Sequence, residues 1–270
     1  MNLKRVMTGL TLLFLLGSGM AIAADFNKGV KAFNSGDYKT AIAEFKPLAE
    51  QGDASSQHNL GLMYEFGYGV PENDKTAVKW YTLAAEQGMP SAQYNLGLMY
   101  DKGEGVPQNY KTAVKWYTKA AEEGVAQAQS SLGTMYANGR GVPENDKTAV
   151  KWFTKAAEQG LAEGQFNLGA MYANGRGVPE NDKTAVKWYT LAAEQGYAIA
   201  QRYLGAMYDF GDGVPRNDKT AVKWYTLASY NGNGVARENK DKVTKQMTPA
   251  DISTAQDMSS RCLDSNYTDC

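Results

Sequence analysis

The chain has 270 residues, of which 43% are hydrophobic and 21% charged, and its formal net charge at pH 7 is −1. This balance gives no basic stripe of the kind that nucleic-acid-binding proteins need, so nucleic acid is excluded as a partner. The length would suit one or two ordinary domains. A repeat with a fixed period covers most of the chain, however, and indicates a stack of small units instead.

Residues 1–23 have the pattern of an export signal. Lys4 and Arg5 form a charged start, a mostly apolar run follows, and small residues lead up to Ala23. The alternative is a membrane anchor, which needs an apolar span of about 20 residues, and this run is shorter. We therefore expect cleavage after Ala23, no stable membrane insertion, and a mature protein that is periplasmic or secreted.

Residues 24–52 are expected to form a divergent N-terminal repeat. The segment 37–42 aligns with 73–78 of the next unit, but the loop and the tryptophan that later units carry are missing. The end unit of a stack is expected to be atypical, because one of its sides faces water.

Five complete units of 36 residues follow without insertions. They span 53–88, 89–124, 125–160, 161–196 and 197–232. All five tryptophans keep this interval, at Trp80, Trp116, Trp152, Trp188 and Trp224. Units of this size cannot bury their apolar faces alone, so the repeat predicts stacking into a solenoid.

Each unit predicts a first helix, a loop and a second helix. In the first complete unit, the first helix is expected over 54–66, and Gly67 ends it in a left-handed turn. Asn73 or Asp74 is expected to cap the second helix. A glycine inside the first helix, such as Gly61, costs about 1 kcal/mol, so close packing of the helices must offset it.

Residues 233–270 lose the period and are expected to form a C-terminal helical cap. Two helices are predicted, over 235–246 and 249–263, with a more polar pattern than the repeats. Cys262 and Cys270 are the only cysteines, and in an oxidising compartment they are expected to form a disulfide that holds the tail. The alternative is a redox-active pair, but the spacing differs from C-x-x-C.

Three motifs recur in the units. They read Ala-Gln-Tyr-Asn-Leu-Gly-Leu-Met-Tyr at 92–100, Gly-x-Gly-Val-Pro at 103–107, and Ala-Val-Lys-Trp-Tyr-x-x-Ala-Ala-Glu-x-Gly at 113–124. Together they resemble the Sel-one-like repeat (SLR) family, strongly over 53–232 and weakly over 25–52. The resemblance implies a right-handed α/α superhelical solenoid of antiparallel helix pairs, similar to tetratricopeptide repeats, that binds proteins or peptides.

What is known of this family implies an exported scaffold or adaptor and not an enzyme. Exported bacterial members take part in envelope assembly, signalling or contact with host cells. A cysteine-rich branch has been linked to penicillin binding and β-lactamase activity, but the repeats of this chain contain no cysteine. A cell-wall-active enzyme, or a binder of glycans or β-lactams, is therefore kept only as the alternative function. A virulence or immune-binding factor would be a binding protein too, with a different partner.

The binding surface is expected on the first helices, because these differ between units whereas the second helices are nearly identical. Positions three or four residues apart share one face of a helix, and first helices usually line the concave side of such solenoids. The candidate residues of this variable face are Ser55, His58, Leu62, Phe66, Tyr94, Lys102, Gln127, Glu163, Phe166, Ile199, Arg202 and Phe210. The alternative is drift on a solvated face, but the several aromatic residues favour a binding groove.

No residue pattern indicates catalysis, a cofactor or a metal site. The Trp-Tyr pairs could stack on sugars, but their helical spacing beside alanines favours core positions. The Pro-Glu-Asn-Asp loops lack the oxygen ladder of a calcium loop, and helix capping explains them. His58 is the only histidine, so a Ser-His-Asp triad or a His-based metal site would depend on it. Four different residues replace it in the other units.

Overall fold

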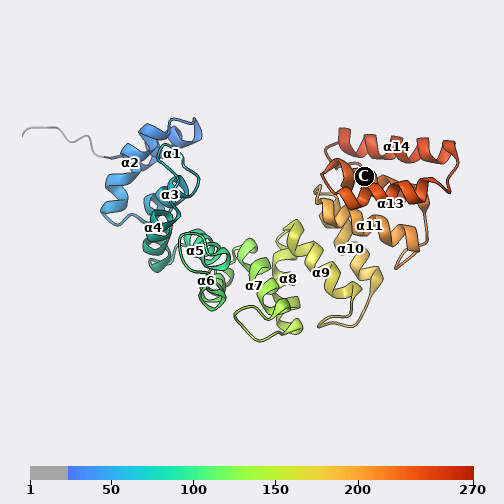
Figure 1. The fold of residues 1–270 in the computed structure, drawn as a ribbon, viewed down its shortest axis with the longest axis horizontal. Helices are drawn as coiled ribbons and strands as arrows, with labels where there is room; N and C mark the ends of the chain where they lie inside the picture. The colour runs from blue at the N-terminus through green and yellow to red at the C-terminus, as the bar shows by residue number, and fades with distance from the viewer. Residues whose placement is uncertain (1–23) are drawn as a thin grey trace, which may run out of the picture.

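A computed structural model describes residues 24–270 as a curved stack of helical hairpins (Figure 1). This part of the chain contains fourteen α-helices and no strand, which confirms the predicted all-α class. The predicted export signal, residues 1–23, lies outside the described residues. None of the described helices has both the length and the apolar character that crossing a membrane requires.

Consecutive helices pack on each other from α1 to α13, and α14 packs on α12. In chain order they are α1 (Phe26–Asn34), α2 (Tyr38–Glu50), α3 (Ala54–Glu65), α4 (Asp74–Glu86), α5 (Pro90–Lys102), α6 (Tyr110–Glu122), α7 (Ala126–Asn138), α8 (Asp146–Glu158), α9 (Ala162–Ala173), α10 (Asp182–Ala193), α11 (Ala198–Phe210), α12 (Asp218–Tyr230), α13 (Gly234–Thr244) and α14 (Pro249–Asp264). The helices α3 to α12 are five hairpins of one design, with a shorter hairpin before them and two further helices after them.

Residues at the turn of each hairpin decide where its helices end and begin. Gly103 ends α5 with a φ of +81°, in the left-handed region that costs other residues energy. The α6 helix begins after Asn109, whose Oδ1 accepts a hydrogen bond from the backbone N–H of Thr112 at 3.0 Å. The equivalent asparagine caps all five second helices. Of the two residues predicted as caps, Asn73 is therefore the cap, and Asp74 is the first residue of α4.

A glycine in the first helix lets the two helices of a hairpin touch. A Cβ atom added at Gly97 would lie 2.6 Å from Cδ1 of Tyr117, whose ring is fully buried. Only glycine fits there, and burial of the ring offsets its cost in the helix. The contact recurs in every complete unit, with Phe153 in place of tyrosine in the third. In the short first hairpin, Gly29 meets Phe45 in the same way.

Buried glutamines form a ladder that joins neighbouring hairpins. Nε2 of Gln201 donates to the Ala193 carbonyl at 3.0 Å, so a free carbonyl at the end of the preceding second helix gains a partner. The equivalent glutamines Gln57, Gln93, Gln129 and Gln165 make the same bond. Within the first complete unit, Gln87 Nε2 also donates to Gln57 Oε1 at 2.7 Å. The ladder was not predicted, because an invariant polar residue in a helix does not indicate its partner.

The loop of each unit rests on the start of the second helix of the preceding unit, and here the side chains vary. Tyr68 stacks on Tyr38 with ring centroids 4.9 Å apart. At a later junction, Nη2 of Arg176 donates to Asp146 Oδ1 at 2.6 Å and to the Ala137 carbonyl at 2.7 Å. One repeated backbone contact is thus stabilised by different side chains at different junctions.

The C-terminal helices cover the last complete unit. The α14 helix packs on α12 and buries Cys262. Lys223 is only 4% exposed, and burial lowers the pKa of its ammonium group to about 8. Its Nζ donates to the backbone carbonyl of Cys270 at 2.5 Å. The Cα atoms of Cys262 and Cys270 are 4.6 Å apart, a separation that suits a disulfide.

Candidate functional site

The variable face lies on the first helices of the five complete units, α3, α5, α7, α9 and α11. Half of its predicted residues are exposed: Phe66, Lys102, Gln127, Glu163, Ile199 and Phe210. The others are half-buried: Ser55, His58, Leu62, Tyr94, Phe166 and Arg202. The face is therefore partly open to solvent and partly engaged with neighbouring helices.

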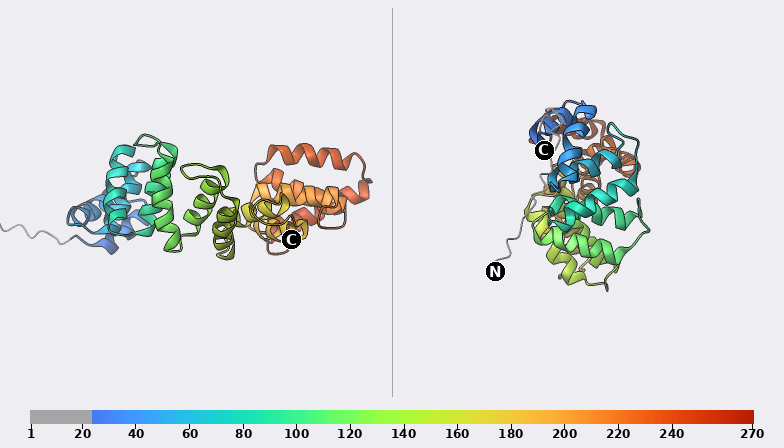
Figure 2. Two further views of the ribbon diagram at one scale, coloured as in Figure 1. Left: turned by 90° about the horizontal axis from the view of Figure 1, so that it is seen from below. Right: turned by 90° about the vertical axis from the view of Figure 1, so that its left-hand side faces the viewer.

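First helices of neighbouring units approach one another in the middle of the stack. The α7 helix packs on α9 of the next unit as well as on its own partner. Burial raises the pKa of Tyr94 on α5, and the carboxylate of Glu163 on α9, two units away, raises it further. Contact between first helices of neighbouring units is expected on the inside of a curved stack, where successive hairpins converge. Figure 2 shows the curved body from two further sides.

In three units, the residue at the position of His58 packs against the aromatic ring of the second helix; we call this place position 58 in every unit. The ring pairs are His58 with Tyr81 at 5.7 Å, Tyr94 with Tyr117 at 5.9 Å, and Phe166 with Tyr189 at 5.6 Å between centroids. Burial lowers the pKa of His58, so its imidazole is neutral at pH 7. Its Nε2 lies 3.1 Å from Nδ2 of Asn95 in the next unit. The predicted residues at this position thus contribute to packing as well as to the surface.

A further position on this face, the residue that follows position 58, was not predicted. In the complete units it is Asn59, Asn95, Ser131, Asn167 and Tyr203. It contacts position 58 of the preceding unit: Nδ2 of Asn167 donates to Ser130 Oγ at 3.4 Å, and the Tyr203 ring lies 5.4 Å from that of Phe166. The sequence contained a signal for it, because Tyr203 stands where the other units have Asn or Ser.

Four aromatic rings gather on this face where α9 and α11 meet; we call Phe166, Tyr189, Tyr197 and Tyr203 the aromatic cluster. The Phe166 ring lies 5.4–5.7 Å from each of the other three. Tyr189 is fully buried, whereas Tyr203 is 38% exposed. The guanidinium carbon of Arg202 lies 4.2 Å from the Tyr203 ring centroid. Rings that are rigidly packed and partly exposed can hold an apolar side chain of a partner.

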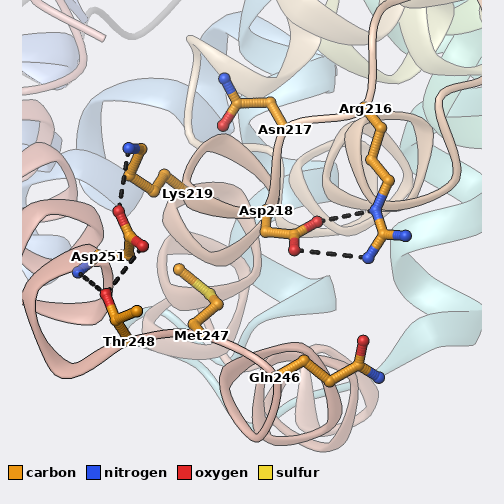
Figure 3. Close-up of a pocket in the computed structure, with 8 residues that line it drawn as sticks. All are labelled: Arg216, Asn217, Asp218, Lys219, Gln246, Met247, Thr248 and Asp251. Atoms are coloured by element: carbon orange, nitrogen blue, oxygen red, sulfur yellow. Dashed lines mark hydrogen bonds and ion pairs between the residues drawn. The ribbon is translucent and has the colours of Figure 1, made fainter.

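Two cavities lie away from the variable face, at the C-terminal end. The larger, of about 390 Å³, lies between the start of α12 and the loop after α13. Figure 3 shows its charged groups paired with one another, Lys219 with Asp251 at 3.1 Å and Arg216 with Asp218 at 2.9 Å. The smaller, of about 280 Å³, contains Lys223. Neither cavity includes a predicted binding residue.

The features set aside in the sequence have structural roles in residues 24–270. The tyrosines of the Trp-Tyr pairs are fully buried, which confirms core positions for them, whereas three of the five tryptophans are half-buried. The asparagines of the Pro-Glu-Asn-Asp loops cap helices. In this part of the chain, no group of three or more His, Cys, Asp or Glu side chains is arranged to hold a metal ion.

The sequence model of the Sel1 repeat matches the chain five times, at residues 54–89, 90–125, 126–161, 162–197 and 198–233. These matches cover more than half of the chain and begin one residue later than the units defined above. No curated protein matches the chain.

Several solved structures are similar to this chain. A Sel1 repeat protein from Oxalobacter formigenes is 32% identical, with a TM-score of 0.79 over 86% of this chain and 97% of that one. A protective antigen present in uropathogenic Escherichia coli strains, which displays an SLR fold, is 34% identical with a TM-score of 0.80. That match covers 87% of this chain but 55% of the antigen, so this chain spans about half of its length. An immunity protein from Pseudomonas aeruginosa, 20% identical with a TM-score of 0.51 over 76% of this chain and 83% of that one, shares the fold alone.

Proposed function

The chain belongs to the Sel1 repeat family, and from this membership we propose that it is an exported scaffold that binds a protein or peptide on the inner face of its first helices. Sel1 repeat proteins generally mediate protein–protein interactions, and their scaffold fold is typically non-enzymatic. Beyond this general property of the family, we propose which surface binds, in which compartment the protein acts and in which process.

One observation supports the choice of surface: the differences between units concentrate on the first helices. Gln127, Glu163 and Ile199 are exposed equivalents of one another, yet they are an amide, an acid and an aliphatic residue. Their neighbours on the second helices are nearly constant. Exposed apolar residues occur on both kinds of helix, such as Phe210 and Ile199 on α11 and Leu83 and Leu191 on second helices. Variation between units, and not apolar exposure alone, therefore supports the first helices.

The proposed compartment is the periplasm or the exterior, with a process in the envelope or in contact with host cells. The export signal predicted from the sequence at 1–23 supports this proposal. A disulfide between Cys262 and Cys270 would be stable only in an oxidising compartment, and their separation suits one. Similarity to a protective antigen of uropathogenic Escherichia coli is consistent with contact with a host.

Site-specific photo-crosslinking in the producing cell tests the proposed surface. A benzophenone amino acid is placed at Gln127 or Ile199, both exposed on first helices, and at Lys151 or Lys187, exposed on second helices of the same array. We expect one discrete partner from the first pair and none from the second. Equal crosslinking from both pairs, or none from either, would refute binding on the inner face.

Chemistry separates the scaffold from the alternative of a cell-wall-active enzyme. Purified protein is incubated with a chromogenic β-lactam and with peptidoglycan, and the products are followed by absorbance and by mass spectrometry. The scaffold is expected to leave both unchanged. Turnover that Arg202→Glu or Tyr94→Ala abolishes would favour the enzyme instead.

A further inference from the structure

The fifth complete unit differs from the others at three neighbouring positions of the inner face. Its residues there are Ile199, Arg202 and Tyr203. The equivalents of Ile199 are Ser55, Ser91, Gln127 and Glu163, and those of Tyr203 are Asn59, Asn95, Ser131 and Asn167. The small polar residues in the other units show that the fold does not require an aliphatic or aromatic residue at either place.

The aromatic cluster gives this region a rigid apolar surface. The Tyr203 ring contacts both Phe166 at 5.4 Å and the buried Tyr189 at 5.7 Å between centroids. Its outer part is exposed, and Ile199, one turn earlier on α11, is 40% exposed. Rings held in this way lose little conformational freedom when a partner side chain covers them.

Arg202 adds a positive charge beside this apolar surface, and no described residue forms an ion pair with it. Its guanidinium lies against the Tyr203 ring, and the described residues offer it neither a hydrogen bond nor an ion pair. On the same helix, Asp209 accepts a hydrogen bond from the hydroxyl of Tyr225. On α9, Glu163 is exposed and forms no ion pair with Arg202. A guanidinium stacked on a ring keeps the donors at its edge free for a carboxylate.

We propose that Ile199, Arg202, Tyr203 and Phe166 form an anchor for an acidic side chain, Asp or Glu, of an extended peptide that also carries an aromatic or large aliphatic residue close by. This proposal rests on the proposed function and names the partner's chemistry. The carboxylate pairs with Arg202, and the apolar side chain covers the exposed edge of Tyr203. In an extended segment, residues i and i+2 point to the same side, roughly 7 Å apart, so one segment reaches both.

The acid belongs to an internal segment and not to a chain end. The inner face continues beyond the anchor onto α9, α7 and α5, where Phe166 and Tyr94 are half-buried. A peptide bound along these helices would extend from the anchor toward the preceding units, and the proposal places the anchored acid inside such a segment. A free C-terminal carboxylate is therefore one of the alternatives that the test separates.

The test is selection of a displayed library of random peptides on the purified full chain. The pool is compared with pools selected on Arg202→Ser and Tyr203→Asn, which copy the residues of other units and keep the fold. The wild-type pool is expected to be enriched in Asp or Glu two residues from Phe, Tyr, Trp or Leu. For a selected peptide with amidated C-terminus, fluorescence anisotropy should show affinity about tenfold lower after either substitution. A Glu→Gln change in the peptide should cost a similar factor.

Lys187→Ser, on the outside of α10, is the matched control and should leave affinity unchanged. Enriched peptides without an acid, peptides that bind only through a free C-terminus, or peptides bound equally by Arg202→Ser would refute the anchor. If such peptides still lose affinity on Tyr94→Ser, the inner face remains the binding surface and only the anchor is wrong. If no peptide is enriched, or none responds to any inner-face substitution, the anchor and the proposed function are both wrong.

Discussion

The second and fourth complete units share their apolar packing but differ in which of their polar groups have hydrogen-bond partners. In the fourth unit, Gln195 donates to Oε1 of Gln165 at 2.8 Å and closes the amide ladder. In the second unit, Glu123 stands where that donor would be, and Oε1 of Gln93 is buried without a hydrogen-bond partner.

For the tyrosine hydroxyls, the second unit has a hydrogen bond that the fourth unit lacks. Tyr117 of the second unit donates to Oδ2 of Asp101 at 3.2 Å, whereas Tyr189 of the fourth unit has Ala173 at the equivalent place. The helices nevertheless differ by only one residue in length, 13 residues in the second unit and 12 in the fourth. Both hairpins have the same contact of a glycine with a tyrosine ring. Apolar contact therefore defines the unit, and hydrogen bonds adjust its stability.

The largest effect is expected from breaking the contact that both units share. Gly97→Ala would place a Cβ atom 2.6 Å from the ring of Tyr117, and Gly169→Ala one 2.8 Å from the ring of Tyr189. Overpacking outweighs the gain in helix propensity, so each should lower the free energy of unfolding by about 2 kcal/mol. Urea denaturation followed by circular dichroism measures this. Gly234→Ala, where nothing lies within 4 Å, is the control and should not destabilise; equal values for all three would contradict the contact.

A smaller loss is expected from opening the ladder in the fourth unit. Gln165→Leu removes the partner of the buried Ala157 carbonyl and of the Gln195 amide. Leaving a buried acceptor unsatisfied should lower the free energy of unfolding by about 1–2 kcal/mol. Gln127→Leu, two residues from the equivalent glutamine but exposed, serves as the control in the same urea titration. An effect no larger than that of the control would show that the ladder is not stabilising.

The smallest effect is a gain from repairing the second unit. Glu123→Gln supplies the donor that Oε1 of Gln93 lacks and should raise the free energy of unfolding by about 0.5–1 kcal/mol. Glu122→Gln makes the same change of charge at an adjacent exposed position and should have no effect. The gain should vanish when Gln93 is replaced by alanine. If the gain in stability persists in the variant without Gln93, it comes from the change of charge and not from the ladder.

Much of the fold could be predicted because its signals lie within one unit. The first helix predicted over 54–66 spans Ala54–Glu65, and the two C-terminal helices agree with their predictions within two residues at each end. Six of the twelve residues predicted for the variable face are exposed, and their role in binding stays a prediction. The aromatic cluster could not be predicted, because Tyr203 and Phe166 belong to different units and only stacking brings their rings together.

The length of the unit, its two helices, its glycine turn and its asparagine cap follow from local sequence, because each depends on residues a few positions apart in the chain. The surroundings of each copy depend on how the units and the C-terminal helices pack. The lysine of the Ala-Val-Lys-Trp motif is exposed at Lys79, Lys115, Lys151 and Lys187. The same lysine is buried at Lys223, where its pKa falls to about 8. Identical local sequence gives different chemistry there because α14, and not another repeat, covers the last unit.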